Sequence, residues 1–474
     1  MRQLFLFFLF LHTCVSNEKP NFLFLLSDDQ SWAGLSVPMH PEKEFSKGAI
    51  YQTPNLEKLA QEGIRFSAAY APSPVCASSR ISLMTGQNCA RLQWTKAGPT
   101  IQDSLGYALT PATNRRSIKD DEITIGELLR DNGYTTAHFG KWHLQNGGPE
   151  KHGFDVSDGN IANEASSHFS GDNPVDIYGM SSRAANFMKA SKESNKPFFV
   201  QMSWLALHSP ENASEASKAA IRKASPSLSD RQLSTAAITR DLDLGVGKLL
   251  ATLEALNLSD NTYVIYMADN GGSGAGGKRQ RGRNSQISNL KGSKGSLWEG
   301  GIRSPLIIRG PGIKANTWCH HRVVGYDLFP TFVELSHSDL PDKRTIDGTS
   351  FAKLLTESKA PFKRSDPLVF HFPHYQSTTP CSAIYDGEYK LLHFYETGEN
   401  ALYHISSDLM ERNDLSTSKP KLAEEMSTSL KGMLKSMGAS FPKPNPQAIA
   451  GKTFDPRETR GPKTKGRGGR ERRR

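Results

Sequence analysis

The sequence has few cysteines and no long apolar run beyond its first residues. It holds five cysteines in 474 residues and no CxxC pair, which argues against a disulfide-rich scaffold and against a cysteine-based zinc site. After the N-terminal segment, no stretch reaches the roughly 20 apolar residues that a membrane-spanning helix needs. We therefore expect a globular protein with no integral membrane segment.

Neither sign of charge predominates in the chain, except at the C-terminal end. Residues 456–474 hold nine Lys or Arg and two Glu, a net +7 of the chain's +10, so the remainder is close to neutral. A Gly-, Pro- and Arg-rich segment cannot bury a core, and we predict that 446–474 is a disordered basic tail. A solvated tail is favoured over a weak anchor on polyanions, and we expect no nucleic-acid partner.

The first 16 residues have the pattern of a signal peptide. A short basic start is followed by an unbroken apolar run from Leu4 to Leu11, and small residues end it near Ser16. Leu11-His12-Thr13 is a poor lipoprotein box before Cys14, which argues against lipid anchoring. The prediction is a secreted or periplasmic protein.

Strand-like and helix-like segments alternate through residues 17–360. Strands are predicted at 21–27, 64–71, 134–139, 197–203, 262–268 and 305–309. Helices are predicted at 77–85, 124–132, 233–256 and 326–336, and another opens at Thr53-Pro54 and ends at Gly63. This alternation indicates an α/β fold with a large, mixed, mostly parallel sheet that is flanked by helices.

The pattern changes near residue 360, where a smaller unit is predicted to span 361–445. Short strands are expected at 368–372, 382–385, 389–394 and 401–405, and a helix at 421–435. Asp386-Gly387 is a hairpin signal between two of these strands. We predict a small antiparallel α+β domain here.

Polar clusters follow four of the predicted strands. They are Asp28-Asp29, Gly140-Lys141-Trp142-His143, His208-Ser209-Pro210 and Asp269-Asn270-Gly271-Gly272. Each cluster alone fits a turn, a helix cap or a packed histidine. Together they favour one pocket, because open α/β sheets bind ligands at the carboxyl ends of their strands. The acidic residues and Asn270 offer oxygen ligands, which suit Ca²⁺ and leave Mg²⁺ possible.

A cysteine motif spans the predicted helix at residues 77–85 and the residues just before it. Residues 72–86, PSPVCASSRISLMTG, resemble the signature of the type I, formylglycine-dependent sulfatases of the alkaline phosphatase superfamily. That signature is Cys or Ser, any residue, Pro or Ala, any residue, Arg, and then a Leu-Met-Thr-Gly stretch. Cys76, Arg80 and residues 83–86 match it, whereas Ser78 departs from it.

Other segments extend the resemblance across residues 20–415. The string of residues 140–144, GKWHL, is characteristic of sulfatases, and residues 291–305 are similar to the family's lysine loop with Lys294 as its active-site lysine. Asp28-Asp29 and Asp269-Asn270 resemble the family's metal pairs. The resemblance implies an alkaline phosphatase-like fold and a sulfuric ester hydrolase.

The resemblance also implies a role for each motif residue. A formylglycine-generating enzyme would oxidise Cys76, and the hydrated aldehyde would attack sulfur and later expel sulfate. Arg80 would steady the nucleophile, Lys141 and Lys294 would bind the sulfate oxygens, His208 would protonate the leaving oxygen, and His143 would take a proton from the hydrate. The expected metal ligands are Asp28, Asp29, Cys76, Asp269 and Asn270.

Substrate selection is expected in the loops. The candidates are the basic segment 278–283, the residues 371–375 (HFPHY) of the small domain, and the polar segment 88–120 with Arg91, Trp94, Arg115 and Arg116. For 278–283 an exposed, flexible loop is an equal alternative, and for 371–375 a strand end with packed aromatic residues is at least as good an interpretation. These surroundings favour a sulfated carbohydrate over a small aryl sulfate as the substrate.

Two other functions remain open at this point. The first is a phosphatase or phosphonate hydrolase of the same superfamily, although those enzymes usually carry Thr or Ser as nucleophile and two metals with His ligands. The second is a non-catalytic sulfoglycan-binding protein whose Cys76 stays unmodified. The sequence leaves the oligomeric state undetermined.

Overall fold

The computed structural model describes residues 19–98, 106–167, 169–170, 172–273, 290–342, 344–456 and 458. The predicted signal peptide, Cys14, the segment 278–283 and, of the basic tail, residues 457 and 459–474 lie outside the described residues, and what was inferred for them stays a prediction. Of the residues assigned to the tail, Ile449 donates a backbone hydrogen bond to Gly106 O at 3.0 Å. Among the described helices, none is both long and apolar enough to cross a bilayer.

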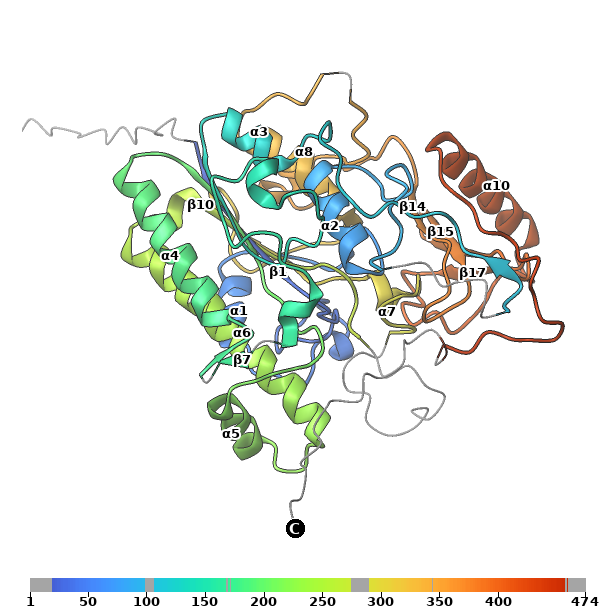
Figure 1. Cartoon of the computed structure of the whole chain (residues 1–474), viewed down its shortest axis with the longest axis horizontal. Helices are drawn as coiled ribbons and strands as arrows, with labels where there is room; N and C mark the ends of the chain where they lie inside the picture. Colours follow the sequence, from blue (N-terminus) through green and yellow to red (C-terminus); the bar gives the residue numbers. More distant parts are fainter. Residues whose placement is uncertain are drawn as a thin grey trace, which may run out of the picture.

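The centre of the molecule is an eight-stranded mixed sheet (Figure 1). β1 (Asn21–Ser27) lies between β10 (Thr262–Ala268) and β9 (Phe198–Ser203), and β5 (Thr135–Gly140) and β6 (Val156–Ser157) continue the sheet beyond β9, all parallel. On the other side, β11 (Leu306–Arg309) runs antiparallel to β10 and to β2 (Ile64–Phe66), and β12 (Thr317–Cys319) ends the sheet. The predicted mixed, mostly parallel sheet is confirmed.

Helices cover both faces of this sheet because its central strands are apolar on both sides. Leu23 and Leu25 of β1 pack with α1 (Pro54–Gln61), α4 (Ile177–Glu193) and α6 (Asp230–Ala255). Phe22, Phe24 and Leu26 point the other way, toward α2 (Cys76–Thr85), α3 (Ile125–Asp131) and α8 (Leu328–Leu335). Every residue of β1 is buried, as a central strand between two helical layers requires.

The prediction of one strand over residues 64–71 was wrong. The chain forms β2 up to Phe66, turns, and then forms β3 (Ala69–Tyr70), which pairs with β13 (Val323–Val324) in a separate two-stranded sheet. The break falls at Ser67, whose N–H donates to Cys319 O at 3.0 Å. An apolar run gives no sign of such a turn when both halves are buried.

The C-terminal part forms the predicted antiparallel sheet. Its strands are β14 (Leu368–Phe372), β15 (Cys381–Asp386), β16 (Tyr389–Phe394) and β17 (Asn400–His404), in that order. α10 (Pro420–Ser436) packs on one face, at the right of Figure 1, and the other face joins the main core through residues such as Phe370 and Tyr385. The sheet therefore lies against the part of the chain that holds the eight-stranded sheet.

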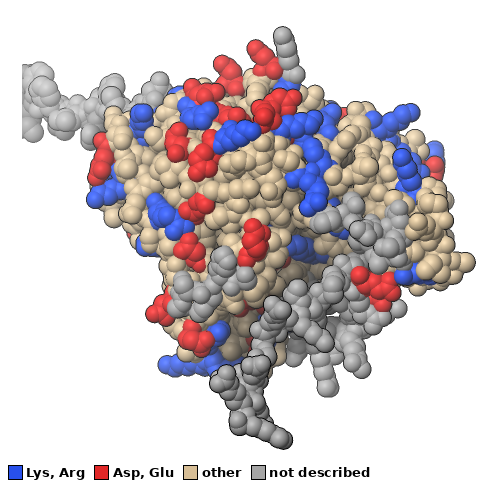
Figure 2. Space-filling view, viewed as in Figure 1, with Lys and Arg blue, Asp and Glu red and all other residues tan. Residues whose placement is uncertain are grey.

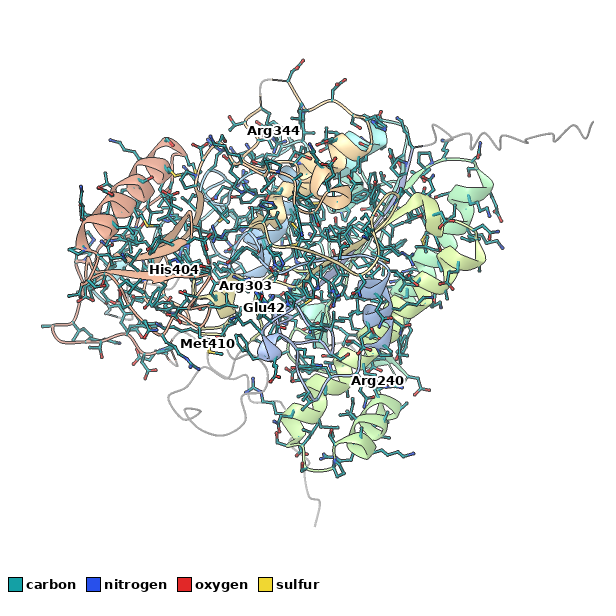
Figure 3. The ribbon with its side chains drawn as sticks, turned by 180° about the vertical axis from the view of Figure 1, so that it is seen from behind. Glu42, Arg240, Arg303, Arg344, His404 and Met410 are labelled. Atoms are coloured by element: carbon teal, nitrogen blue, oxygen red, sulfur yellow. The ribbon has the colours of Figure 1, made fainter. Side chains whose placement is uncertain are left out.

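A buried charge network joins this sheet to the part of the chain that holds the eight-stranded sheet. Lys390 of β16 lies 3.1 Å from Glu299 and 2.7 Å from Glu411, and Arg303 Nε donates to Glu299 at 2.7 Å. Burial raises the pKa of Glu299, but Lys390 and Arg303 outweigh it and bring the pKa to about 2. Arg303, near the centre of Figure 3, also lies over the rings of Trp32 and Tyr70. Glu299 begins α7 (Glu299–Ile302), so the network anchors the end of the lysine loop.

Candidate active site

An acidic cluster forms where β1 and β10 end. The two strands are parallel and in register, with Ser27 opposite Ala268, so the residues that follow them meet at one edge of the sheet. Oxygen atoms of Asp28, Asp29 and Asp269 lie within 4.8 Å of one another, and all three residues are buried. Asp29 adopts a left-handed backbone conformation with φ of 59°, which is uncommon for a residue with a side chain and turns it toward its neighbours.

This cluster fits a hard divalent cation. Asp28 Oδ1 and Asn270 Oδ1 are buried and have no hydrogen-bond partner among the described residues. The Nδ2 of Asn270 donates to Asp29 Oδ1 and to Gly271 O, both at 2.8 Å, which fixes the side-chain amide. Carboxylate and amide oxygens without protein donors suit Ca²⁺ or Mg²⁺.

The acidic residues also repel one another. Burial and the neighbouring Asp28 raise the pKa of Asp269 to about 8, in spite of Arg80 and Lys141. For Asp28, Lys141, His208 and Arg80 outweigh burial and lower the pKa below its ordinary value. Two carboxylates this close in a dry pocket are stabilised by additional positive charge, which a divalent cation would supply.

Arg80 links the cysteine helix to the acidic cluster. It follows Cys76 by one turn of α2, and its Nε and Nη2 donate to Asp269 Oδ2 at 3.0 and 2.7 Å. Its Nη1 donates to Lys141 O at 2.8 Å. Burial lowers the pKa of Arg80, but Asp269, Asp28 and Cys76 outweigh it and raise the pKa. Cys76 thus lies within electrostatic range of the cluster.

Ser78, which departs from the motif, faces away from this contact. Its hydroxyl hydrogen-bonds the Ser73 hydroxyl at 2.8 Å and Val75 O at 3.2 Å. The Ser79 hydroxyl also bonds the Ser73 backbone, with Ser73 N donating to it at 3.0 Å. The two serines therefore brace the turn that leads into α2.

Two lysines form ion pairs with the acidic cluster. Lys141 donates to Asp28 Oδ2, and Lys294 donates to Asp29 Oδ1 at 2.5 Å. The backbone of the lysine loop is fixed by Lys294 N, which donates to Gly272 O at 3.0 Å, and by Gly295 N, which donates to Pro74 O at 2.8 Å. Burial lowers the pKa of Lys294, but Asp29 and Cys76 outweigh it and raise the pKa above the ordinary value.

Two histidines border the same site. His143 has φ of 61°, is buried, and has no hydrogen-bond partner at Nδ1 among the described residues. Burial and Lys141 lower its pKa to about 3, so the ring is neutral near pH 7. His208 is half-buried, and its loop is fixed on β1 because Asp28 N donates to Ala206 O at 2.9 Å. The structure thus brings the predicted site residues together around the acidic cluster.

Other predicted candidates lie elsewhere. His371 and His374 are buried and hydrogen-bonded, to Ser382 at 2.6 Å and to Thr95 at 2.7 Å, so they pack within the small sheet's interface and do not face a ligand. Sequence reasoning also missed Asn163, whose buried Oδ1 has no partner among the described residues and lines a cavity with His143. A single Asn in a polar segment carries no signal of such a position.

Comparison with family models gives two matches. A model described as "Sulfatase" matches residues 20–338. A model described as "N-sulphoglucosamine sulphohydrolase, C-terminal" matches residues 293–439. The first match covers the pairs Asp28-Asp29 and Asp269-Asn270, the cysteine motif and the lysine loop.

Individual proteins are similar over much of the chain. A sulfatase of Formosa agariphila is 28% identical, over 88% of this chain and 89% of its own length. The N-acetylgalactosamine-6-sulfatase of Sus scrofa is 31% identical, over 72% of this chain and 67% of its own length.

Solved structures share the fold. Ps i-CgsB, solved also in complex with k-i-k-neocarrahexaose, superimposes with a TM-score of 0.71 at 25% identity, over 88% of this chain and 93% of its own. The phosphonate monoester hydrolase of Agrobacterium radiobacter superimposes with a TM-score of 0.63 at 16% identity, over 90% of this chain and 99% of its own, which shows a common fold alone.

Proposed function

Because the chain belongs to the sulfatase family, we propose that it hydrolyses a sulfate ester of a carbohydrate and that its nucleophile is a formylglycine made from Cys76. The observation that carries this proposal is the contact of Arg80 with Asp269, which places the start of α2 against the acidic cluster. A formylglycine-generating enzyme would carry out the oxidation. An aldehyde hydrate has a second hydroxyl, which lets it release sulfate where a plain serine or cysteine ester could not.

We assign the cation to Asp28, Asp29, Asp269, Asn270 and the modified residue 76. When bound, Ca²⁺ or Mg²⁺ would make a nearby hydroxyl easier to deprotonate and would offset charge on the sulfate oxygens. The two unpartnered oxygens, Asp28 Oδ1 and Asn270 Oδ1, support this assignment. Arg80 would keep Asp269 oriented as the charge in the site changes.

The remaining residues would bind the sulfate group and move protons. Lys141 and Lys294 have ammonium groups at the acidic cluster and would bind sulfate oxygens as negative charge shifts during the reaction. His143 lies within electrostatic range of Asp28 and Lys141 and would accept a proton from the nucleophile. His208, on the loop beside Asp28, would donate a proton to the leaving oxygen.

A sulfated carbohydrate is the substrate that the surroundings favour. The cavity beside His143 includes Arg116, Gln145, Asn163 and Glu164, whose side chains can bond sugar hydroxyl and anionic groups. A nitrophenyl group would leave these polar groups unused. The similarity to an N-acetylgalactosamine-6-sulfatase and to a structure solved in complex with k-i-k-neocarrahexaose is in keeping with this choice.

A phosphatase or phosphonate hydrolase is the less suitable alternative. Within the described residues, the acids that could hold a metal form one group, and that group has no histidine. The nucleophile position is a cysteine in a sulfatase motif, and neither feature is typical of two-metal phosphatases. A sulfoglycan-binding protein with unmodified Cys76 would keep the same lysines and would differ only in turnover.

Turnover of a substrate panel tests the proposal. The protein should be produced together with a formylglycine-generating enzyme and supplied with Ca²⁺. We expect release of inorganic sulfate from at least one sulfated mono- or oligosaccharide, with kcat/KM well above that for nitrophenyl sulfate. Activity on the aryl ester alone would reject the carbohydrate assignment, and phosphate release without sulfate release would reject the sulfatase assignment.

A further inference from the structure

Three arginines lie close together in the polar segment 88–120, and two of them are neutralised. Arg91 pairs with Asp347 at 2.7 Å, and Arg115 pairs with Glu122 at 2.7 Å. The exposed guanidinium of Arg116 makes no ion pair or hydrogen bond with any residue that the structure describes. Basic and acidic side chains are interspersed over the face shown in Figure 2.

Arg116 lies at a cavity that opens beside the candidate active site. The cavity has a volume of about 510 Å³, and its lining includes Trp94, Arg116, His143, Asn163 and Glu164. Its wall is built on the β5 strand end, because Trp142 N and His143 N both donate to Ile161 O, at 2.9 and 3.0 Å. The segment that carries Asn163 and Glu164 is therefore fixed against the histidine.

The same segment reaches the second histidine. Ser166 Oγ donates to Ser209 O at 3.1 Å, and Asn212 Nδ2 donates to Ser166 O at 3.3 Å, which ties it to the loop of His208. A group that leaves the sulfur centre near His208 would thus have this segment beside it. The Oδ1 of Asn163, a residue that lines the cavity, is buried and has no hydrogen-bond partner among the described residues.

We propose that this cavity binds the sugar part of the substrate and that Arg116 binds a second anionic group of the same glycan, a sulfate or a carboxylate. The inference rests on the proposed function and adds to it a preference for multiply charged substrates. A planar guanidinium suits either anion, since it offers paired N–H donors to two oxygens.

A second cavity nearby does not offer the same recognition. It has a volume of about 550 Å³ and is lined by Arg91, Arg115 and Lys119, among others. Its two arginines are already paired with carboxylates, so they would have to break an ion pair to bind an anion. Lys119 is exposed, lies three residues from Arg116 and faces this other cavity, which makes Lys119→Ala a matched control for the loss of one positive charge.

Kinetics on matched substrates test the proposal. The wild-type protein, Arg116→Ala, Arg116→Lys and Lys119→Ala should each be assayed on one sulfated sugar, on the same sugar with a second sulfate, and on the same sugar linked to a uronate. We expect Arg116→Ala to lower the preference for the doubly charged sugars, measured as a ratio of kcat/KM, by about tenfold or more and chiefly through KM. Arg116→Lys should recover part of the preference, and Lys119→Ala should leave it within about twofold.

The outcomes separate this inference from the proposed function. Loss of preference for one of the two anions identifies which group Arg116 binds. An unchanged ratio in Arg116→Ala, or an equal change in Lys119→Ala, overturns the inference, while turnover by the wild-type protein still supports the sulfatase assignment. Absence of sulfate release by the wild-type protein would overturn the proposed function. Calorimetric binding of the same sugars to Cys76→Ser, with and without Arg116→Ala, would then show whether Arg116 still discriminates between them.

Discussion

Arg80 holds Asp269 through two N–H groups, Nε at 3.0 Å and Nη2 at 2.7 Å, and both groups contact the same carboxylate oxygen. Asp269 Oδ1 is left to accept from Asp29 N at 3.2 Å. One residue of the cysteine helix therefore sets the orientation of a carboxylate that follows β10. Because Arg80 also donates to Lys141 O, it connects α2 with the segments that follow β10 and β5.

Replacing Arg80 with lysine should remove most of the activity. A lysine keeps the charge but cannot contact Asp269 and the Lys141 carbonyl together, so Asp269 would lose its fixed orientation. We expect kcat/KM to fall by about 100-fold, and Ca²⁺ to bind more weakly in calorimetry. Arg91→Lys is a matched control, since Arg91 makes a similar two-donor contact with Asp347 outside the site. Equal activity of the two variants would contradict the role given to Arg80.

Removal of the cation should lower both activity and stability. A chelator should abolish sulfate release, and Ca²⁺ at about 100 times its Kd should then stabilise the fold by about 2.7 kcal/mol, which a thermal shift can detect. Asp28→Asn should lose most of this Ca²⁺-dependent shift. Asp386→Asn, at an exposed carboxylate of the small sheet, should keep it. A chelator-treated protein with full activity would show that the acidic cluster needs no metal.

Breaking the buried charge network should destabilise the protein more than it changes the chemistry. Lys390→Met leaves Glu299 and Glu411 buried without their shared ammonium, so the free energy of unfolding should fall by about 3–5 kcal/mol in chemical denaturation. Adding Glu411→Gln should recover part of the loss. Lys431→Met removes an exposed lysine of α10 and should change stability by less than about 0.5 kcal/mol. A small effect of Lys390→Met would mean that the network is solvated in solution.

Lys96 should make stability depend on pH above neutrality. Burial lowers the pKa of Lys96 to about 8, so its charged form destabilises the folded state at pH 7. That penalty shrinks as the pH rises from about 8 toward the ordinary value near 10.5, because the folded protein then releases a proton that the unfolded chain keeps. Lys96→Met removes this penalty but also loses the 3.1 Å hydrogen bond that Lys96 donates to Tyr375 O. The variant should therefore have a net gain in stability of about 1 kcal/mol over the wild type at pH 7. The difference should narrow by pH 10, and a difference that grows with pH would be evidence against this account.

The sequence predicted those parts of the fold in which local pattern and burial agree. β1, β9 and β10 are continuous apolar runs, and the polar residues that follow them meet because parallel strands in register end together. The motif of residues 76–86 also marked α2 correctly to within one residue. α4 was not predicted, although it packs on the sheet, since its apolar positions are spaced among small and polar residues.

Long-range pairing accounts for what the sequence did not show. Glu299, Lys390 and Glu411 are far apart in sequence, and each alone reads as an exposed charge. His371 and His374 read as ligand-binding candidates because a histidine next to aromatic residues has the same pattern in a core and in a site. Asp347 pairs with Arg91 and Glu122 pairs with Arg115, which leaves Arg116 unpaired among the described residues. Only the folded chain reveals which of these arginines has a carboxylate partner.

The most direct test of the account is the mass of the tryptic peptide that contains residue 76, taken from protein that has been shown to release sulfate. Conversion of the Cys76 thiol to an aldehyde should lower the peptide mass by about 18 Da relative to the unmodified sequence. We predict this loss in the active protein. An active preparation in which residue 76 is entirely an unmodified thiol would contradict the claim that formylglycine is the nucleophile.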